Sequence, residues 1–309
     1  MVHRNNCIYA SPVDRMYRIT KLSLVASKGL PPACTNLQQS SVECTTYQWK
    51  SRLERPLISI VIPAYNESAR IGHALDEVLR CVHGRDWHAE ILVVNDGSTD
   101  RTDAIVQEFA QEHPEVRLLN NARNRGKGFS VRHGVLHAVG EIVMFTDADL
   151  SAPMEEAERL FDALRQGADI AIGSRWLERM RQTLQQPLYR QFFGRCFNAI
   201  TRLVMGLPFA DTQCGFKAFR RPVAQTIFQL QRIERWGFDP ELLFIALKRG
   251  YKIREVPVTW GHDERSRLSY LKDGVKMLED IAYIRWEAFA GAYDRTVVDC
   301  TPEWPVVKG

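Results

Sequence analysis

Apolar residues in the first half of the chain follow two patterns that alternate. Residues 57–62 and 90–94 are short, mostly apolar runs, whereas residues 68–82 repeat apolar positions at helical spacing. Apolar runs without polar alternation are typical of strands that are buried on both faces of a sheet. Residues 56–174 therefore predict strands and helices in turn, which is the pattern of an α/β fold with a mostly parallel central sheet flanked by helices.

The same two patterns define the remaining predicted elements. Further strands are predicted at residues 116–119, 141–145, 169–172, 216–219 and 252–258. Further helices are predicted at residues 99–109, 128–139, 154–166, 189–205, 222–230, 240–248 and 271–286. Ser98 or Thr99 is the expected N-cap of the helix at 99–109, because a hydroxyl oxygen there can accept a hydrogen bond from the first turn.

The ends of the chain differ from this regular region. Residues 1–55 contain scattered Ser, Thr, Gln and Asn without sustained periodicity, and we expect a poorly ordered basic N-terminal tail. One domain is expected over residues 56–288, with a first half at 56–174 and a second half at 175–288 that elaborates the same sheet. Residues 289–309 are expected to form a C-terminal tail.

Charge is distributed unevenly along the chain. The formal net charge is +4, but residues 56–174 carry 11 basic and 19 acidic side chains, whereas residues 175–285 carry 20 and 11. These counts give net charges of −8 and +9, which indicate two chemically different surfaces or, alternatively, a chance distribution over solvated faces. The small total gives no support for a nucleic-acid partner, and we expect none.

Composition limits the class of protein. With 45% hydrophobic and 25% charged residues, the chain has ordinary globular values, which exclude a disordered or fibrous protein. Its seven cysteines form no C-x-x-C pair and favour a reducing compartment without structural zinc. No apolar run approaches the ~20 residues that span a bilayer, and the N-terminus lacks a signal-peptide pattern. We therefore expect a cytoplasmic or peripheral protein.

Polar clusters follow three of the predicted strands, at residues 63–67, 95–98 and 146–149. Each cluster alone is typical of a turn or a helix cap, but parallel strands bring their carboxyl ends to one edge of the sheet, where ligands bind. Asp147 and Asp149 offer carboxylate oxygens to a hard cation, so the sequence predicts a Mg²⁺ or Mn²⁺ site there. Such an ion would neutralise a leaving diphosphate.

Two common nucleotide-binding motifs are missing. The sequence contains no G-x-x-x-x-G-K-[ST] and no G-x-G-x-x-G after the first strand. A nucleotide could instead be held by stacking on Tyr65 and by hydrogen bonds to Asp96. Asn124 and Lys127 lie in a glycine-rich turn at residues 124–128, where Lys127 could reach a phosphate; the alternative is an ordinary turn with a solvated lysine.

Four segments together resemble one family. Pro-Ala-Tyr-Asn-Glu, Val-Asn-Asp-Gly-Ser-Thr-Asp, Asn-Arg-Gly-Lys-Gly and Thr-Asp-Ala-Asp are similar, in this order, to segments of the inverting family 2 glycosyltransferases with the GT-A fold. The resemblance covers residues 56–288. It implies contacts of Pro63, Tyr65, Glu67 and Asp96 with the nucleotide, and of Asp147 and Asp149 with the metal and diphosphate.

Later segments resemble a narrower group. Residues 173–175, 211–217 and 234–243 are similar to those of dolichyl-phosphate β-glucosyltransferases, whose relatives that transfer mannose generally lack the Arg-Trp-x-Phe-Asp-x-Glu run. The resemblance implies UDP-glucose as donor and a polyprenyl phosphate as acceptor. Residues 264–268 read Glu-Arg-Ser-Arg-Leu where the group often has Gly-Ser-Lys-Leu, which leaves the identity of the acceptor open.

The arginines of the basic half suit a phosphate acceptor, because a guanidinium group binds phosphate through a planar fork of donors. The alternative is a solvated basic face. The predicted acceptor-binding residues are Arg175, Arg190, Arg195, Gln213, Arg235, Trp236, Ser266 and Arg267. A phosphate monoester is already anionic near pH 7 and needs no base, whereas a sugar hydroxyl would need one.

The predicted catalytic residues are Asp149, Arg175, Asp239 and Glu241. Asp239 and Glu241 are candidates for a base or for contacts with sugar hydroxyls; alternatively, they are acidic residues at the start of a helix. Besides glucose transfer, the sequence leaves open a mannosyltransferase that uses GDP-mannose and a family 2 enzyme that acts on a glycan hydroxyl.

A polyprenyl acceptor would require contact with a membrane. Residues 189–205 combine an apolar side with arginines, as in a helix at the surface of an anionic bilayer, or as in a helix packed on the core. We expect peripheral association with the cytoplasmic face of a membrane.

Overall fold

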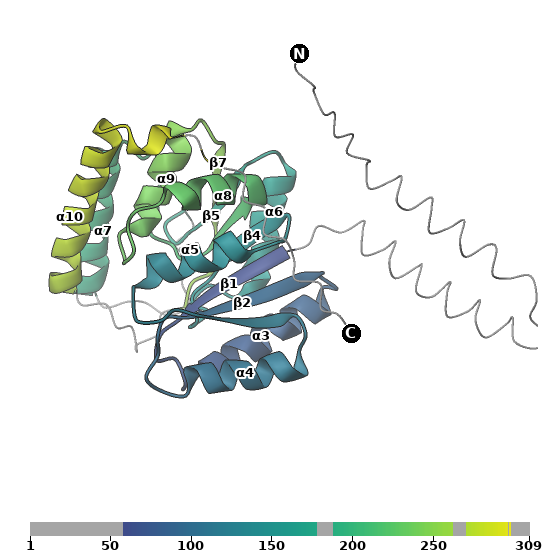
Figure 1. Ribbon diagram of the computed structural model, residues 1–309. Coiled ribbons are helices and arrows are strands. Elements are labelled where there is room, and N and C mark those ends of the chain that lie inside the picture. Colours follow the sequence, from purple (N-terminus) through teal and green to yellow (C-terminus); the bar gives the residue numbers. More distant parts are fainter. Residues whose placement is uncertain (1–57, 178–187, 262–269, 296, 298–309) are drawn as a thin grey trace, which may run out of the picture. The chain divides into compact units, whose positions relative to one another are not determined.

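The computed structural model describes residues 58–177, 188–261, 270–295 and 297, and Figure 1 shows how they are arranged. The side chains of residues 188–193 and 270–273 also lie outside the description. All described residues belong to one compact unit, Arg55–Gly309.

Seven strands of the described chain form a single sheet in the order β3-β2-β1-β4-β6-β5-β7. They are β1 (Ile58–Ala64), β2 (Ala89–Asn95), β3 (Val116–Asn120), β4 (Ile142–Phe145), β5 (Ile170–Ser174), β6 (Lys217–Arg220) and β7 (Ile253–Pro257). The neighbouring pairs are parallel except at β6, which runs antiparallel to β4 and β5. The amino end of β6 therefore lies at the edge where β4 and β5 end.

Helices alternate with these strands. They are α3 (Ile71–Gly84), α4 (Thr102–Glu112), α5 (Lys127–His137), α6 (Ala157–Arg165), α7 (Leu188–Met205), α8 (Arg221–Leu230), α9 (Phe238–Lys248) and α10 (Tyr270–Phe289), with short 3₁₀ turns at η1 (Met154–Glu156) and η3 (Ala292–Asp294). Each predicted strand and helix has a counterpart here, so the α/β fold with a mostly parallel sheet is confirmed.

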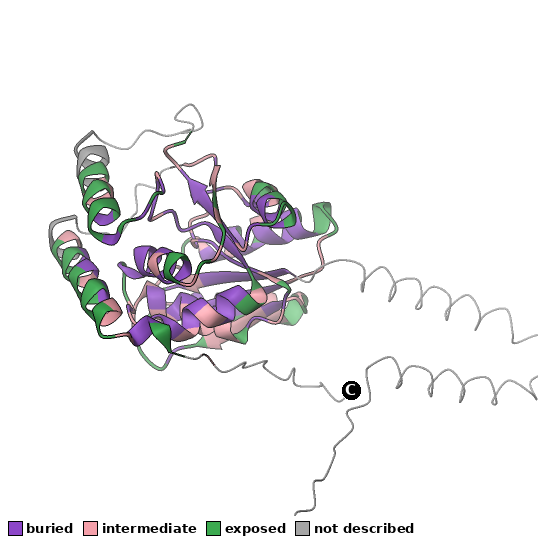
Figure 2. Cartoon of the chain, turned by 90° about the horizontal axis from the view of Figure 1, so that it is seen from above, coloured by how far each residue is buried: buried purple, intermediate pink, exposed green. Residues whose placement is uncertain are grey.

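The sheet has a hydrophobic core on each face. Along β1, Ile60 and Ile62 pack toward α3, α4 and α6, whereas Val61 packs toward α5, α8 and α9. Figure 2 shows the buried strands at the centre, between layers of helices. Strands covered on both sides are apolar at most positions, which explains their runs without alternation.

The helices α7 and α10 lie side by side at one margin of the fold (Figure 1). Met205 of α7 and Ile281 and Ile284 of α10 join the core on the α9 side of the sheet. Among the described residues, no helix is long and apolar enough to cross a membrane.

The predicted cap of the helix at 99–109 was wrong. The helix α4 begins at Thr102, and the backbone N–H of Thr102 donates to Asp100 at 3.0 Å. The Ser98 hydroxyl oxygen instead accepts from the N–H of Asn66 at 2.9 Å, and the Thr99 hydroxyl donates to the Asn66 side chain at 3.3 Å. Both hydroxyl groups connect the loop after β1 to the loop after β2. The side chain of Asp100 instead accepts the hydrogen bond from the start of α4.

Candidate active site

The carboxyl ends of β1, β2, β4 and β5 and the amino end of β6 meet at one edge of the sheet. Ala64 pairs with Asn95, and Phe145 pairs with Lys217. The polar clusters that follow β1, β2 and β4 are therefore neighbours, as the sequence predicts.

Asp147 and Asp149 lie just beyond β4. The Nζ atom of Lys127, at the start of α5, lies 2.5 Å from Oδ1 of Asp147, and it also lies 5.5 Å from the centroid of the Trp236 ring. Burial lowers the pKa of Lys127, but the charges of Asp147, Asp239 and Asp149 outweigh this effect, and the pKa is raised. Lys127 is thus a permanent cation beside the two predicted metal ligands.

Burial, followed by the charge of Asp147, raises the pKa of the Asp149 carboxyl group. Its Oδ1 accepts a hydrogen bond from the N–H of Ser151 at 3.0 Å. Beside it lies a cavity of about 420 Å³ between the start of α3 and residues 148–155. Two neighbouring carboxylates match the donor set of a hard divalent cation.

The loop after β1 carries Tyr65 and Glu67. The side chain of Tyr65 is exposed, whereas Glu67 forms an ion pair with Arg70, with Oε1 accepting from Nη2 at 2.8 Å. The N–H of Glu67 also donates to the hydroxyl of Thr102 at 2.7 Å. The loop is therefore fixed at its base, and the ring of Tyr65, two residues after Pro63 of β1, is exposed.

Asp96 has a structural task in addition to its predicted one. Its carboxylate accepts from the side chain of Asn121 at 2.8 Å and from the backbone N–H groups of Arg125 and Gly126 at 3.0 and 2.8 Å. Asp96 thereby holds the glycine-rich turn on which Asn124 is exposed and Lys127 begins α5. Contact of Asp96 with a base or ribose stays a prediction.

The glycine-rich turn packs directly on a segment of the second half. The N–H of Phe129 donates to the carbonyl oxygen of Glu234 at 2.9 Å, and the Glu234 carboxylate pairs with Arg125. A Cβ atom on Gly126, whose φ is +115°, would lie 2.6 Å from that carbonyl oxygen, and one on Gly128 would lie 2.7 Å from the carbonyl oxygen of Ile233. Only glycine permits this close approach.

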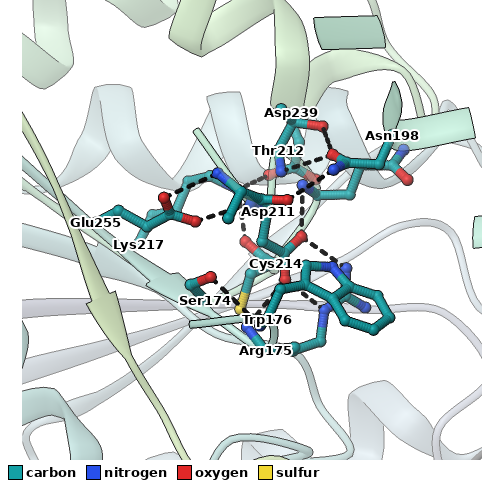
Figure 3. A network of polar contacts seen from close by, with 12 residues as sticks. Ser174, Arg175, Trp176, Asn198, Asp211, Thr212, Cys214, Lys217, Asp239 and Glu255 are labelled. Atoms are coloured by element: carbon teal, nitrogen blue, oxygen red, sulfur yellow. Dashed lines mark hydrogen bonds and ion pairs between the residues drawn. The ribbon is translucent and has the colours of Figure 1, made fainter. Parts of the chain in front are cut away.

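Arg175, which follows β5, is bound to Asp211 through both oxygens of the carboxylate (Figure 3). Its Nε and Nη2 atoms donate to Oδ2 and Oδ1 at 2.6 and 2.8 Å. Burial tends to raise the pKa of Asp211, but the charge and hydrogen bonds of Arg175 lower it below its ordinary value. Both oxygens of Glu255 accept from the backbone of Ala210 and Asp211, so the pair rests on a fixed loop.

Asp239 and Glu241 lie in the first turn of α9, and both are buried. Asp239 pairs with Lys217, whereas the Glu241 carboxylate accepts from the N–H groups of Arg232 and Ile233, each at 2.9 Å. Glu241 also accepts from the hydroxyl of Tyr293 at 2.8 Å. The Glu241 carboxylate therefore holds the backbone of Arg232 and Ile233, which precede α9. Its predicted catalytic role stays a prediction.

The predicted acceptor-binding residues fall into two groups. Gln213 is half-buried and donates its N–H to Asp211 at 3.1 Å, Arg235 and Trp236 are exposed, and the Arg195 guanidinium lies 5.1 Å from the ring centroid of Trp176. The side chain of Arg190, and Ser266 and Arg267 as a whole, lie outside the described residues.

Residues 211–217 belong to the segments that carry the resemblance, but sequence reasoning did not predict that Lys217 pairs with Asp239 or that Arg175 pairs with Asp211. Lys217 is the one charged residue of the predicted strand at 216–219, and this mismatch was the available signal. Asp211 is 36 residues from Arg175, and Glu255, which accepts from the backbone of Asp211, is 44 residues from Asp211; no local pattern predicts such contacts.

Comparison with known proteins supports this interpretation. Residues 59–228 match Glycosyl transferase family 2. A dolichyl-phosphate β-glucosyltransferase of Trichomonas vaginalis is 39% identical over 239 residues, which cover 73% of this chain and 70% of the relative. The dolichyl-phosphate β-glucosyltransferase of Saccharomyces cerevisiae is 32% identical over 260 residues, which cover 78% and 77%.

A solved structure shares the fold. Glucosyl-3-phosphoglycerate synthase from Mycobacterium tuberculosis, crystallised with Mn²⁺, UDP and glucosyl-3-phosphoglycerate, superposes with a TM-score of 0.57 at 21% identity. The match covers 77% of this chain and 81% of that one. The GT-A architecture of the described residues is thereby confirmed.

Proposed function

The chain belongs to Glycosyl transferase family 2, and we propose that this glycosyltransferase moves glucose from UDP-glucose to a dolichyl or related polyprenyl phosphate. The product would be a β-linked glucosyl phospholipid, formed with inversion at the anomeric carbon. The observation that carries the proposal is the convergence of Asp147, Asp149 and Lys127 at the sheet edge, beside the fixed pair of Arg175 and Asp211.

In this proposal Asp147 and Asp149 bind Mg²⁺ or Mn²⁺, completed by phosphate oxygens of the donor. The bound cation would stabilise the negative charge of the departing UDP. The fit rests on the paired carboxylates: burial, followed by the charge of Asp147, raises the pKa of Asp149, and a bound cation would stabilise its charged form. Lys127 would contact the diphosphate, and Tyr65 would stack on the base.

The acceptor side needs cations and no base, because a phosphate monoester is already anionic near pH 7. Arg175 is half-buried, and burial lowers its pKa, but the charge of Asp211 and the hydrogen bonds to Asp211 outweigh this effect and raise the pKa, so Arg175 keeps its charge. Arg195 lies near it across Trp176. Asp239 is paired with Lys217 and would not act as the base that a glycan hydroxyl needs. These groups would bind and orient the phosphate, which is the main source of rate here.

The outer faces of α7 and α10 would rest on the cytoplasmic surface of a membrane. Leu203 is 85% exposed, Trp286 68% and Phe289 89%, and Val275 and Leu278 continue the apolar stripe on α10. Arg202, Lys276 and Arg285 lie on the same two helices, where they could meet anionic lipid headgroups. Large exposed apolar side chains in contiguous rows mark an interaction surface.

The proposal is tested by incubating the purified protein with Mg²⁺ or Mn²⁺, a polyprenyl phosphate and, separately, UDP-glucose or GDP-mannose. We expect a glucosyl lipid from UDP-glucose, and at least a hundredfold lower rate for Asp149→Asn. Asp76→Asn, at an exposed position of α3, is the control and should keep full activity. Lipid product from GDP-mannose alone would overturn the assignment of the donor, and no lipid product would overturn that of the acceptor.

A further inference from the structure

A lysine with no part in the proposed chemistry lies directly behind the predicted metal ligands. Lys217 opens β6 and pairs in register with Phe145 of β4, two residues before Asp147. Its side chain has no exposed surface. An ammonium group is costly to bury, so a lysine at such a position requires a matched charge and hydrogen-bond acceptors.

Lys217 joins three segments of the site, as Figure 3 shows for two of its partners. Its Nζ atom donates to the carbonyl oxygen of Cys214 at 2.5 Å and forms an ion pair with Asp239 at the start of α9. The same atom lies 5.6 Å from the ring centroid of Phe145. The turn before β6, the start of α9 and the end of β4 are thus fixed to one buried cation.

The turn that Lys217 holds is in contact with Asp147. A Cβ atom on Gly215 would lie 2.9 Å from Cγ and 3.0 Å from Oδ1 of Asp147, and closer still to Oδ2. The backbone of the turn therefore forms the wall against which the carboxylate rests. Movement of this wall would change where Asp147 presents its oxygens.

We propose that Lys217 is a positioning residue, which fixes the Asp147 carboxylate for a divalent cation and nucleoside diphosphate through its bond to the carbonyl of Cys214. Asp239 is the counter-ion of Lys217 in this arrangement. The inference rests on the proposed function of Asp147 and Asp149 as metal ligands. Residues that hold a metal ligand in position typically contribute to metal affinity, and their removal by mutation lowers it by about 10–100-fold.

The test uses Lys217→Met alone and Lys217→Met combined with Asp239→Asn. The single variant leaves a buried carboxylate without its cation, so its Tm should fall. The double variant removes both charges and leaves the net charge unchanged. It should regain most of the lost Tm, yet bind Mn²⁺ in the presence of UDP about tenfold more weakly, because the turn is no longer held.

The matched control is Lys248→Met combined with Asp294→Asn, which removes an ion pair of 2.8 Å that is largely solvated. This control should bind Mn²⁺ and UDP like the wild type. Binding is measured by calorimetry and by the electron paramagnetic resonance signal of Mn²⁺, so no acceptor lipid is needed. A merely structural role of Lys217 would let the double variant regain both Tm and affinity, which would overturn the proposal. No Mn²⁺ binding by the wild type would overturn the metal site as well.

Discussion

Replacing Gly215 with Ala tests how closely the sheet edge determines the position of Asp147. The φ of Gly215 is not in the left-handed region, so alanine adds one methyl group without backbone strain. That methyl group would lie 2.9 Å from Cγ of Asp147, where ordinary contacts of a Cβ atom begin near 3.4 Å. Either the carboxylate or the turn must therefore move.

The size of the effect follows from the geometry. Clearing the closest oxygen needs a shift of about 1 Å, and misplacement of a catalytic group by this distance can cost about a hundredfold in rate. Overpacking of a buried contact costs about 1–3 kcal/mol of stability. We therefore expect kcat to fall by about a hundredfold, with half-maximal activity at a higher Mn²⁺ concentration, while most of the protein stays folded at 25 °C.

The assay is a titration of glucosyl-lipid formation with Mn²⁺, at saturating donor and acceptor, with unfolding by urea as the measure of stability. Gly84→Ala, at the end of α3, is the matched control, because a Cβ atom there would meet nothing within 4 Å. Full kcat and an unchanged Mn²⁺ titration for Gly215→Ala would refute the reasoning that this turn sets the position of Asp147.

Three further predictions follow from burial, packing and exposure. Burial raises the pKa of Glu241 to about 7, against 4.5 for an ordinary Glu, so the folded state binds more protons and the free energy of unfolding should fall by about 3 kcal/mol as the pH rises from 4.5 to above 7. Urea unfolding across this range should show that slope in the wild type and not in Glu241→Gln; equal slopes would contradict it. Gly126→Ala should destabilise the protein by at least about 2 kcal/mol, and Gly167→Ala, with φ of +94° but nothing within 4 Å, by only about 1 kcal/mol. Trp286→Ser combined with Phe289→Ser should reduce flotation with anionic liposomes, whereas Leu247→Ser on α9 should not; equal flotation of both would argue against the membrane face.

Most of the fold could be predicted from the sequence because the central strands are buried on both faces. Residues such as Ile60, Val61 and Ile62 must all be apolar there, which produces an unmistakable run. The start of α4 could not be placed, because Ser98 and Thr99 are typical caps that the tertiary structure uses elsewhere.

The sequence predicted the site residues that directly follow strands. It did not predict contacts between residues that are far apart in the sequence. Asp147 and Asp149 could be predicted as site residues because they come directly after an apolar run that predicts a strand. The partner of Arg175 is Asp211, in the loop before β6, and the partner of Lys217 is Asp239, at the start of α9; both pairs join segments that are far apart in the sequence. The role of Asp96 could not be predicted for a different reason. An aspartate can bind a ligand or hold a turn through hydrogen bonds, and the sequence does not distinguish the two roles.

The packing of the glycine-rich turn also dictates the order in which the domain can be completed. Arg125 and its partner Glu234 are 109 residues apart, and a Cβ atom on Gly126 would lie 2.6 Å from the carbonyl oxygen of Glu234. During synthesis the contacts of the glycine-rich turn with residues 233–235 can form only after the chain has grown past residue 235. A fragment that ends at residue 174 would therefore keep this turn unsettled, and mixing it with the complementary fragment should restore the turn and the donor site together.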